Sequence, residues 1–101
     1  MAYTIIVSKA AEDMLLQHIA FLARVSKEAA REEKEKLITA IRGLAEDPLI
    51  YPFLDEEYLP RNKYHKRPVA KRSLILYQVK DETVYVDLIL DVRRDYSWLI
   101  H

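Results

Sequence analysis

A single glycine, Gly43, stands in this chain of 101 residues. Glycine-rich loops let the backbone approach the phosphates of a nucleotide, so their absence excludes nucleotide-binding folds of the P-loop and dinucleotide-binding kinds. The chain must therefore form helices and strands joined by turns that need little glycine. Half of its residues are hydrophobic, which predicts one folded domain over residues 1–101.

Cysteine is absent, which excludes disulfides and thiolate metal ligands and fits a reducing compartment. The first residues lack the charged segment and long apolar stretch of a signal peptide, and no apolar run approaches the ~18 residues of a membrane helix. We therefore expect a cytoplasmic protein without a membrane partner. No histidine–carboxylate spacing typical of metal sites occurs, so neither a metal nor another cofactor is expected.

The first half of the sequence predicts a strand followed by a helical hairpin. Residues 3–7 are rich in β-forming side chains, and Ser8 and Ser26 are placed to cap two helices with apolar residues at helical spacing. The wholly charged stretch 31–36 is expected to leave the middle of the second helix solvated. The pair Asp47-Pro48 is expected to end that helix, because the residue before proline is pushed out of the α region.

The second half predicts an irregular surface loop over residues 49–62 and then three strands, at residues 64–71, 73–80 and 83–90. Pro68 implies that the first of these is an edge strand or carries a bulge. The element order β-α-α-β-β-β predicts an α+β fold in which the helical hairpin packs on a twisted, mainly antiparallel four-stranded sheet.

The last predicted strand alternates between apolar and polar side chains. Val84, Val86, Leu88 and Leu90 are expected on one face of the sheet. The acidic residues Asp87 and Asp91 then share the other face, which the pattern predicts to be exposed to solvent.

The charges are divided unequally between the two halves, although the net charge is zero. Residues 1–57 hold 7 Lys and Arg against 11 Asp and Glu, whereas residues 58–101 hold 9 against 5. The basic segment, residues 61–72, contains six cations and no acid, namely Arg61, Lys63, Lys66, Arg67, Lys71 and Arg72. Such a segment is either a solvated strand face or a surface for phosphates or an acidic partner.

Strand alternation predicts how the basic segment divides between the faces of the sheet. His65, Arg67, Val69 and Lys71 are expected on one face, and Lys66 and Arg72 on the other. Arg93 and Arg94 follow the last strand, so Arg94 can lie near Arg67 or Arg72. Cations that converge repel one another unless an anion is bound, which favours a phosphate or acidic ligand. The alternative is a set of separate surface charges, each paired with a nearby acid.

The remaining candidates are few. Of the three histidines, His18 is expected to be packed in the first helix, whereas His65 is a candidate for proton transfer. No Ser-His-Asp arrangement is recognisable, and Tyr77 is expected in the core. Trp98 either docks the C-terminal segment onto the domain or anchors a partner.

An ordered set of motifs resembles the RelE/ParE superfamily of bacterial toxins and covers nearly the whole chain. The set comprises YTIIV running into SKAAED (3–13), LAEDP (44–48), YHKR (64–67), LILYQV (74–79), VYV (84–86) and RRDY (93–96). The resemblance implies the toxin of a type II toxin–antitoxin system, as found in plasmid stabilisation, held inactive by a cognate antitoxin. One branch of the family enters the ribosome and cuts mRNA without a metal. The other inhibits DNA gyrase and is not a nuclease.

In the nuclease branch, cations bind the scissile phosphate while an acid and a base flank the attacking 2′-OH. The resemblance assigns this work to Arg67, Arg72 and Arg94, with His65 or Tyr96 transferring protons. Residues that would bind RNA or a partner are Arg61, Lys63, Lys66, Lys71, Arg93 and Trp98.

Two departures weigh against catalysis. Ribosome-directed members are usually strongly basic, whereas this chain is neutral, and the glycine common before the third-strand tyrosine–arginine pair is replaced by Lys71-Arg72-Ser73. The near-neutral charge and long hairpin resemble the gyrase-directed branch. A third possibility is a diverged, non-toxic interaction module of the same fold.

Overall fold

The structure is a computed structural model that describes residues 2–55, 61–70 and 72–91. The expected order β-α-α-β-β-β is confirmed. The elements are β1 (Thr4–Val7), α1 (Lys9–Ala23), α2 (Lys27–Gly43), the 3-10 turn η1 (Pro48–Ile50), β2 (His65–Val69), β3 (Ser73–Lys80) and β4 (Thr83–Asp91).

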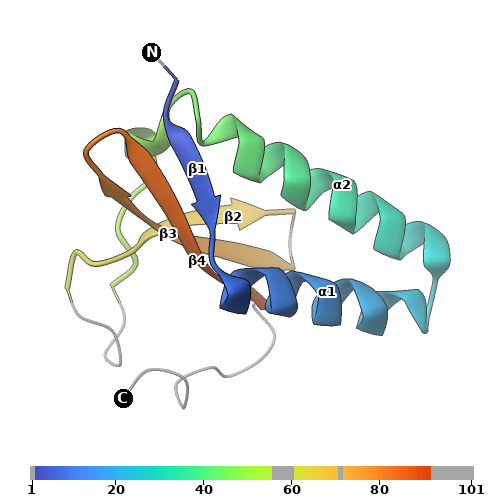
Figure 1. Cartoon of the computed structure of the whole chain (residues 1–101). Coiled ribbons are helices and arrows are strands. Elements are labelled where there is room, and N and C mark those ends of the chain that lie inside the picture. The colour runs from blue at the N-terminus through green and yellow to red at the C-terminus, as the bar shows by residue number, and fades with distance from the viewer. Residues whose placement is uncertain (1, 56–60, 71, 92–101) are drawn as a thin grey trace.

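The four strands form one sheet in the order β1-β4-β3-β2, and α1 and α2 form a hairpin packed against it (Figure 1). Strand β1 runs parallel to β4, whereas β3 pairs antiparallel with both β4 and β2. The expected α+β fold with a mainly antiparallel sheet is therefore confirmed. Pro68 lies in β2, an edge strand of the sheet, where its missing N–H breaks no interior ladder.

Both predicted helix caps are present. The hydroxyl of Ser8 accepts from the N–H of Ala11 at 3.0 Å, and that of Ser26 accepts from the N–H of Ala29 at 3.1 Å. These contacts satisfy backbone donors that a helix leaves unpaired in its first turn. Only three residues separate the helices, which confirms the tight antiparallel hairpin.

Helix α2 ends at Gly43, four residues before the predicted Asp47. Beyond Gly43 the chain tightens, since the N–H groups of residues 44–46 each bond to the carbonyl three residues back, at 3.1 Å. The N–H of Tyr3, just before β1, bonds to the carbonyl of Ala45 at 2.7 Å. That contact fixes the chain beyond α2 against the start of the sheet. Pro48 then begins the separate turn η1 and is buried.

The core lies between the helices and one face of the sheet. Its sheet side includes Ile75, Tyr77, Val84 and Val86, all fully buried, and its helix side includes Leu37. The prediction for Tyr77 is therefore confirmed. A second, smaller cluster on the opposite face of the sheet contains Leu54, Tyr64, Leu76 and Leu90.

A β-bulge at Asp87 corrects the predicted alternation along β4. Tyr77 of β3 pairs with Val86, but the preceding residue Leu76 pairs with Leu88, so Asp87 is extra. The extra residue reverses the faces beyond it. Val84 and Val86 therefore face the helices with Ile89, whereas Leu88 and Leu90 join the cluster on the far face. Asp91 is turned from the expected exposed face into a buried position, with 6% of its surface exposed.

Part of the predicted surface loop lies beside β2 instead. Phe53 forms an isolated antiparallel bridge with His65. The N–H of Leu54 bonds to the carbonyl of Tyr64 at 2.7 Å, and the N–H of Lys66 bonds to the carbonyl of Pro52 at 2.9 Å. Leu54 is buried by this pairing. The segment thus covers part of an edge that would otherwise be open.

Candidate partner-binding site

The basic segment is divided between both faces of the sheet. Arg67 pairs with the core residue Ile75 and so faces the helices, whereas Lys66 pairs with Leu76 and faces away. This agrees with the predicted alternation. Arg61 and Lys63 are exposed just before β2, and the Lys63 ammonium lies 5.2 Å from the centre of the Tyr64 ring.

Arg72 departs from its predicted face. It lines a hollow of about 410 Å³ together with Glu32, Glu33 and Lys36 of α2, so it lies on the helix side with Arg67 and not with Lys66. The physical reason is the turn after β2, where Ala70 adopts the left-handed backbone with a φ of 54°. The strand alternation therefore does not extend from β2 to Arg72.

A larger groove lies between α2 and β2, and we call it the α2–β2 groove. Its volume is about 700 Å³, and its lining includes Glu35, Ala40, Gly43, Tyr51, Arg67 and Val69. It shares Glu32, Lys36 and Ala70 with the hollow at Arg72, so the two form one continuous depression. Arg67 and Arg72 are thus brought to the same depression, which Glu32, Glu33, Glu35 and Lys36 of α2 also line.

Arg67 is held at this groove by local contacts. Its guanidinium lies 5.0 Å from the centre of the Tyr51 ring, a cation–π arrangement, and it also donates a hydrogen bond to the carbonyl of Pro68. These contacts fix the position of the charge while leaving the side chain half-buried.

His65 is enclosed by aromatic rings. Its imidazole stacks on Phe53, with centroids 4.2 Å apart, and on Tyr77, with centroids 5.2 Å apart. Its Nδ1 lies 2.7 Å from the carbonyl oxygen of Tyr51. Since a carbonyl only accepts, Nδ1 carries the proton and only Nε2 is left for proton exchange.

Tyr77, which lies beneath His65, anchors the turn η1. Its hydroxyl donates to the carbonyl of Pro48 at 2.5 Å. Burial raises the pKa of Tyr77, and the nearby Tyr51 adds to the rise. The phenol therefore stays neutral and serves as a structural donor.

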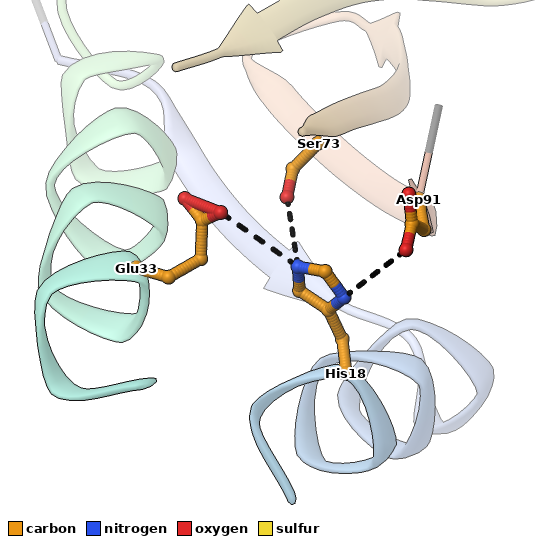
Figure 2. Close-up of polar contacts among 4 residues, drawn as sticks. All are labelled: His18, Glu33, Ser73 and Asp91. Carbon is orange, nitrogen blue, oxygen red and sulfur yellow. Dashed lines mark hydrogen bonds and ion pairs between the residues drawn. The ribbon is translucent and has the colours of Figure 1, made fainter. Parts of the chain in front are cut away.

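A buried polar cluster that sequence reasoning missed joins both helices to the sheet (Figure 2). The Nε2 atom of His18 lies 3.2 Å from the hydroxyl of Ser73 and 3.7 Å from a carboxylate oxygen of Glu33. Its Nδ1 atom lies 3.8 Å from a carboxylate oxygen of Asp91. The expectation that His18 is packed is confirmed, since its side chain is 8% exposed.

Ser73, His18 and Asp91 have the order of contacts found in a Ser-His-Asp triad, although the sequence showed no such arrangement. A nucleophile must be reached by substrate, and Ser73 is only 1% exposed. The cluster therefore ties α1, α2, β3 and β4 together and is no catalytic site in this conformation. Within the described ranges, no group of three or more His, Cys, Asp or Glu side chains is arranged to hold a metal ion.

Two features hid this cluster in the sequence. Glu33 lies in the charged stretch that was expected to be solvated, yet it is 4% exposed, and its Oε2 has no hydrogen-bond partner in the described part of the chain. The stretch is otherwise exposed, so the prediction was wrong for this residue alone. Asp91 reaches the cluster only because of the bulge at Asp87.

Five of the predicted site residues lie outside the described residues, namely Lys71, Arg93, Arg94, Tyr96 and Trp98. Among the helices that are described, none combines the length and the apolar character needed to cross a bilayer.

No protein-family model matches the sequence, and no curated protein matches it. A solved structure does resemble it. A chain of the "Chromosomal ParDE TA system from P. aeruginosa" superposes with a TM-score of 0.72 and 11% sequence identity. The match covers 89% of this chain and 96% of that chain. At this identity, the likeness shows a shared fold over nearly the full length of both chains.

Proposed function

We propose that this chain is the toxin of a type II toxin–antitoxin pair, that it acts in the cytoplasm, and that it inhibits its target by binding. The observation that carries the proposal is the shared fold with a chain of the ParDE system, because the match spans nearly all of both chains. The motif resemblance to the same superfamily supports it independently of the structure.

Inhibition by binding is favoured over RNA cleavage by the arrangement of the described cations. A metal-free nuclease needs fixed cations around one phosphate and an accessible proton donor. Of the cations assigned to the phosphate, Arg67 and Arg72 border one depression. The Arg67 guanidinium, however, lies over the Tyr51 ring, and Glu32 and Glu33 line the hollow beside Arg72. His65 is stacked between two rings. DNA gyrase is the target that the resemblance implies for such a binder.

The proposed antitoxin carries an acidic segment that covers the basic segment. Arg61 and Lys63 are exposed, and Arg67 and Arg72 border one depression. An acidic partner would gain attraction over distance and ion pairs on contact with these residues.

Induced expression in a bacterial host tests this function. We expect growth to stop on induction and to resume when the product of the neighbouring reading frame is co-expressed. Harmless expression of folded protein would contradict the proposal and favour the non-toxic interaction module.

A further inference from the structure

The two edges of the sheet are protected unequally. The outer edge of β2 is partly covered by residues 52–54, which bond to the backbone of Tyr64 and Lys66. Strand β1 forms the other edge and pairs only with β4 among the described strands (Figure 1). Its sequence, Thr-Ile-Ile-Val, contains neither a charged residue nor a proline, the residues that commonly keep an edge strand from pairing. Strand β1 is therefore the open edge of the described sheet.

The free hydrogen-bonding groups of β1 belong to two of its residues. The N–H groups of Thr4 and Ser8 bond at 2.9 Å to carbonyls of β4 and of the turn before it. Because successive N–H groups of a strand point to opposite sides, those of Ile5 and Val7 point away from β4. No hydrogen bond joins these two N–H groups to another residue in the described ranges. The edge thus offers two donors and two carbonyl acceptors.

This spacing is complementary to itself. In an antiparallel pair, opposite residues alternate between those that exchange two hydrogen bonds and those that exchange none. When Ile6 stands opposite Ile6 of a second copy, Ile5 stands opposite Val7, and Val7 opposite Ile5. Every outward N–H and carbonyl of these two residues then has a partner. The pairing is two-fold symmetric, as interfaces between identical chains usually are.

The ends of β1 favour a second copy over a longer strand. At one end, the N–H of Tyr3 is already bonded to the carbonyl of Ala45 at 2.7 Å. At the other end, α1 begins at Lys9 and turns back over β4. In the register given above, Lys9 of one copy stands opposite Tyr3 of the other. A longer partner strand would meet the chain at Ala45, whereas a second copy leaves the edge at that point.

The charges around β1 also suit a second copy. The strand itself is uncharged, so two copies meet without like charges along it. Glu46 is exposed and directly follows Ala45, so the register brings Lys9 of each copy near Glu46 of the other. Lys9 contacts Asp13 of its own helix at 3.1 Å, and 80% of its side chain is exposed. Opposite charges thus complement each other at both ends of the pairing.

The pairing would bury apolar side chains that the single chain exposes. Ile6 is 47% exposed and Val7 37%. Ile6 pairs with the half-buried Tyr85 of β4, so each Ile6 would lie between a tyrosine of its own chain and Ile6 of the second copy. Cross-strand pairs of β-branched and aromatic residues stabilise sheets.

We propose that two copies of this chain associate through antiparallel pairing of β1 with β1, with Ile6 at the two-fold axis. The two four-stranded sheets then form one continuous sheet. The interface is small, so the dimer should form at micromolar concentrations and dissociate on dilution. The inference does not rest on the proposed function.

A disulfide cross-link tests the register, because the chain contains no cysteine of its own. Ile6→Cys should form a disulfide-linked dimer on mild oxidation, since residues opposite each other without hydrogen bonds have Cα atoms about 4.5 Å apart, within disulfide range. Thr4→Cys is the matched control on the same face of the same strand. Its two copies would lie about 13 Å apart, so it should stay monomeric on a reducing-agent-free gel. Equal cross-linking of the two variants, or none, would overturn the inference.

Sedimentation velocity over a dilution series tests the association itself. Ile6→Lys should raise the dissociation constant of the dimer about tenfold or more, because two ammonium groups would meet at the axis. The control Gln17→Lys, an exposed substitution on α1, should associate like the wild type. Val7→Pro removes only an outward N–H and should also dissociate the dimer, with its melting curve as the check on folding. A wild type that is monomeric throughout, with Ile6→Lys instead blocking the product of the neighbouring reading frame, would give this edge to the antitoxin and overturn the inference.

Discussion

The Nδ1 atom of His18 lies 3.8 Å from a carboxylate oxygen of Asp91, which connects α1 to the end of β4. On the other side of the ring, Nε2 lies 3.7 Å from Glu33 of α2. All three side chains are at most 8% exposed. His18 thus contacts a buried carboxylate on each side, and its removal takes a polar contact from Glu33, whose Oε2 has no hydrogen-bond partner among the described residues.

His18→Leu should therefore lower the free energy of unfolding by about 2 kcal/mol, the cost typical of leaving a buried polar group without its partner. Urea denaturation measures this loss, with the exposed neighbour Gln17→Leu as control. Adding Glu33→Leu should restore part of the stability, because it removes the buried carboxyl group that has lost its contact with His18. A double variant less stable than the sum of the two single losses would contradict a cluster held by these polar contacts.

This cluster also shows where prediction from sequence stops. The spacing of hydrophobic residues and the serine helix caps depend only on residues close together in the sequence. The element order and both helix starts were therefore predicted correctly. The bulge at Asp87 was missed because the three consecutive apolar residues that follow it, Leu88 to Leu90, are equally compatible with a regular strand covered on both faces. The burial of Glu33 depends on His18 and Asp91, whose nearness only the tertiary fold creates.

The candidate site was also predicted only in part from the sequence. Strand alternation correctly placed Arg67 and Val69 with His65 and separated them from Lys66, because pairing along one strand fixes that pattern. The stacking of Phe53 on His65 was not predictable, since Phe53 comes from a segment without regular pattern. The groove was missed as well, because its two walls come from α2 and β2.

Stability at high pH should depend on Tyr77. Because its pKa is raised in the folded chain, its contribution is complete below the ordinary tyrosine pKa of about 10 and is lost as the pH rises above it, where the unfolded chain ionises first. Tyr77→Phe should thus show a smaller loss of stability between neutral and strongly alkaline pH than the wild type, measured by urea denaturation. Tyr85→Phe, on a half-buried tyrosine of β4, is the control. An equal loss of stability at alkaline pH in the wild type and in Tyr77→Phe would disprove that the ionisation of Tyr77 destabilises the fold.

The two helix caps should differ in strength. Ser26 only accepts from the N–H of Ala29, whereas Ser8 accepts from the N–H of Ala11 and also donates to the carbonyl of Asp87 at the bulge, at 2.9 Å. Ser26→Ala should cost about 1 kcal/mol, and Ser8→Ala about 2 kcal/mol, because it also leaves the bulge carbonyl without its donor. Thermal denaturation of the two variants compares them directly. Equal losses would show that the bond to the bulge adds nothing.

Neutralisation by the antitoxin should require the cations of the continuous depression. Arg67→Glu combined with Arg72→Glu should abolish the growth rescue given by the product of the neighbouring reading frame, because like charges would then face its acidic segment. The charge-matched control is Arg24→Glu combined with Lys80→Glu, two exposed residues outside the basic segment. Rescue that persists in the folded Arg67 and Arg72 variant would rule out this surface as the acidic segment's contact.

A supercoiling assay with purified DNA gyrase, run beside mapping of mRNA ends after induction, tests most directly whether the chain acts by binding. We expect the wild-type protein to inhibit supercoiling while translated messages stay intact. Unaffected supercoiling with new cuts in translated messages would contradict this and would place the chemistry on Arg67, Arg72 and Arg94, with His65 or Tyr96 as the group that transfers the proton.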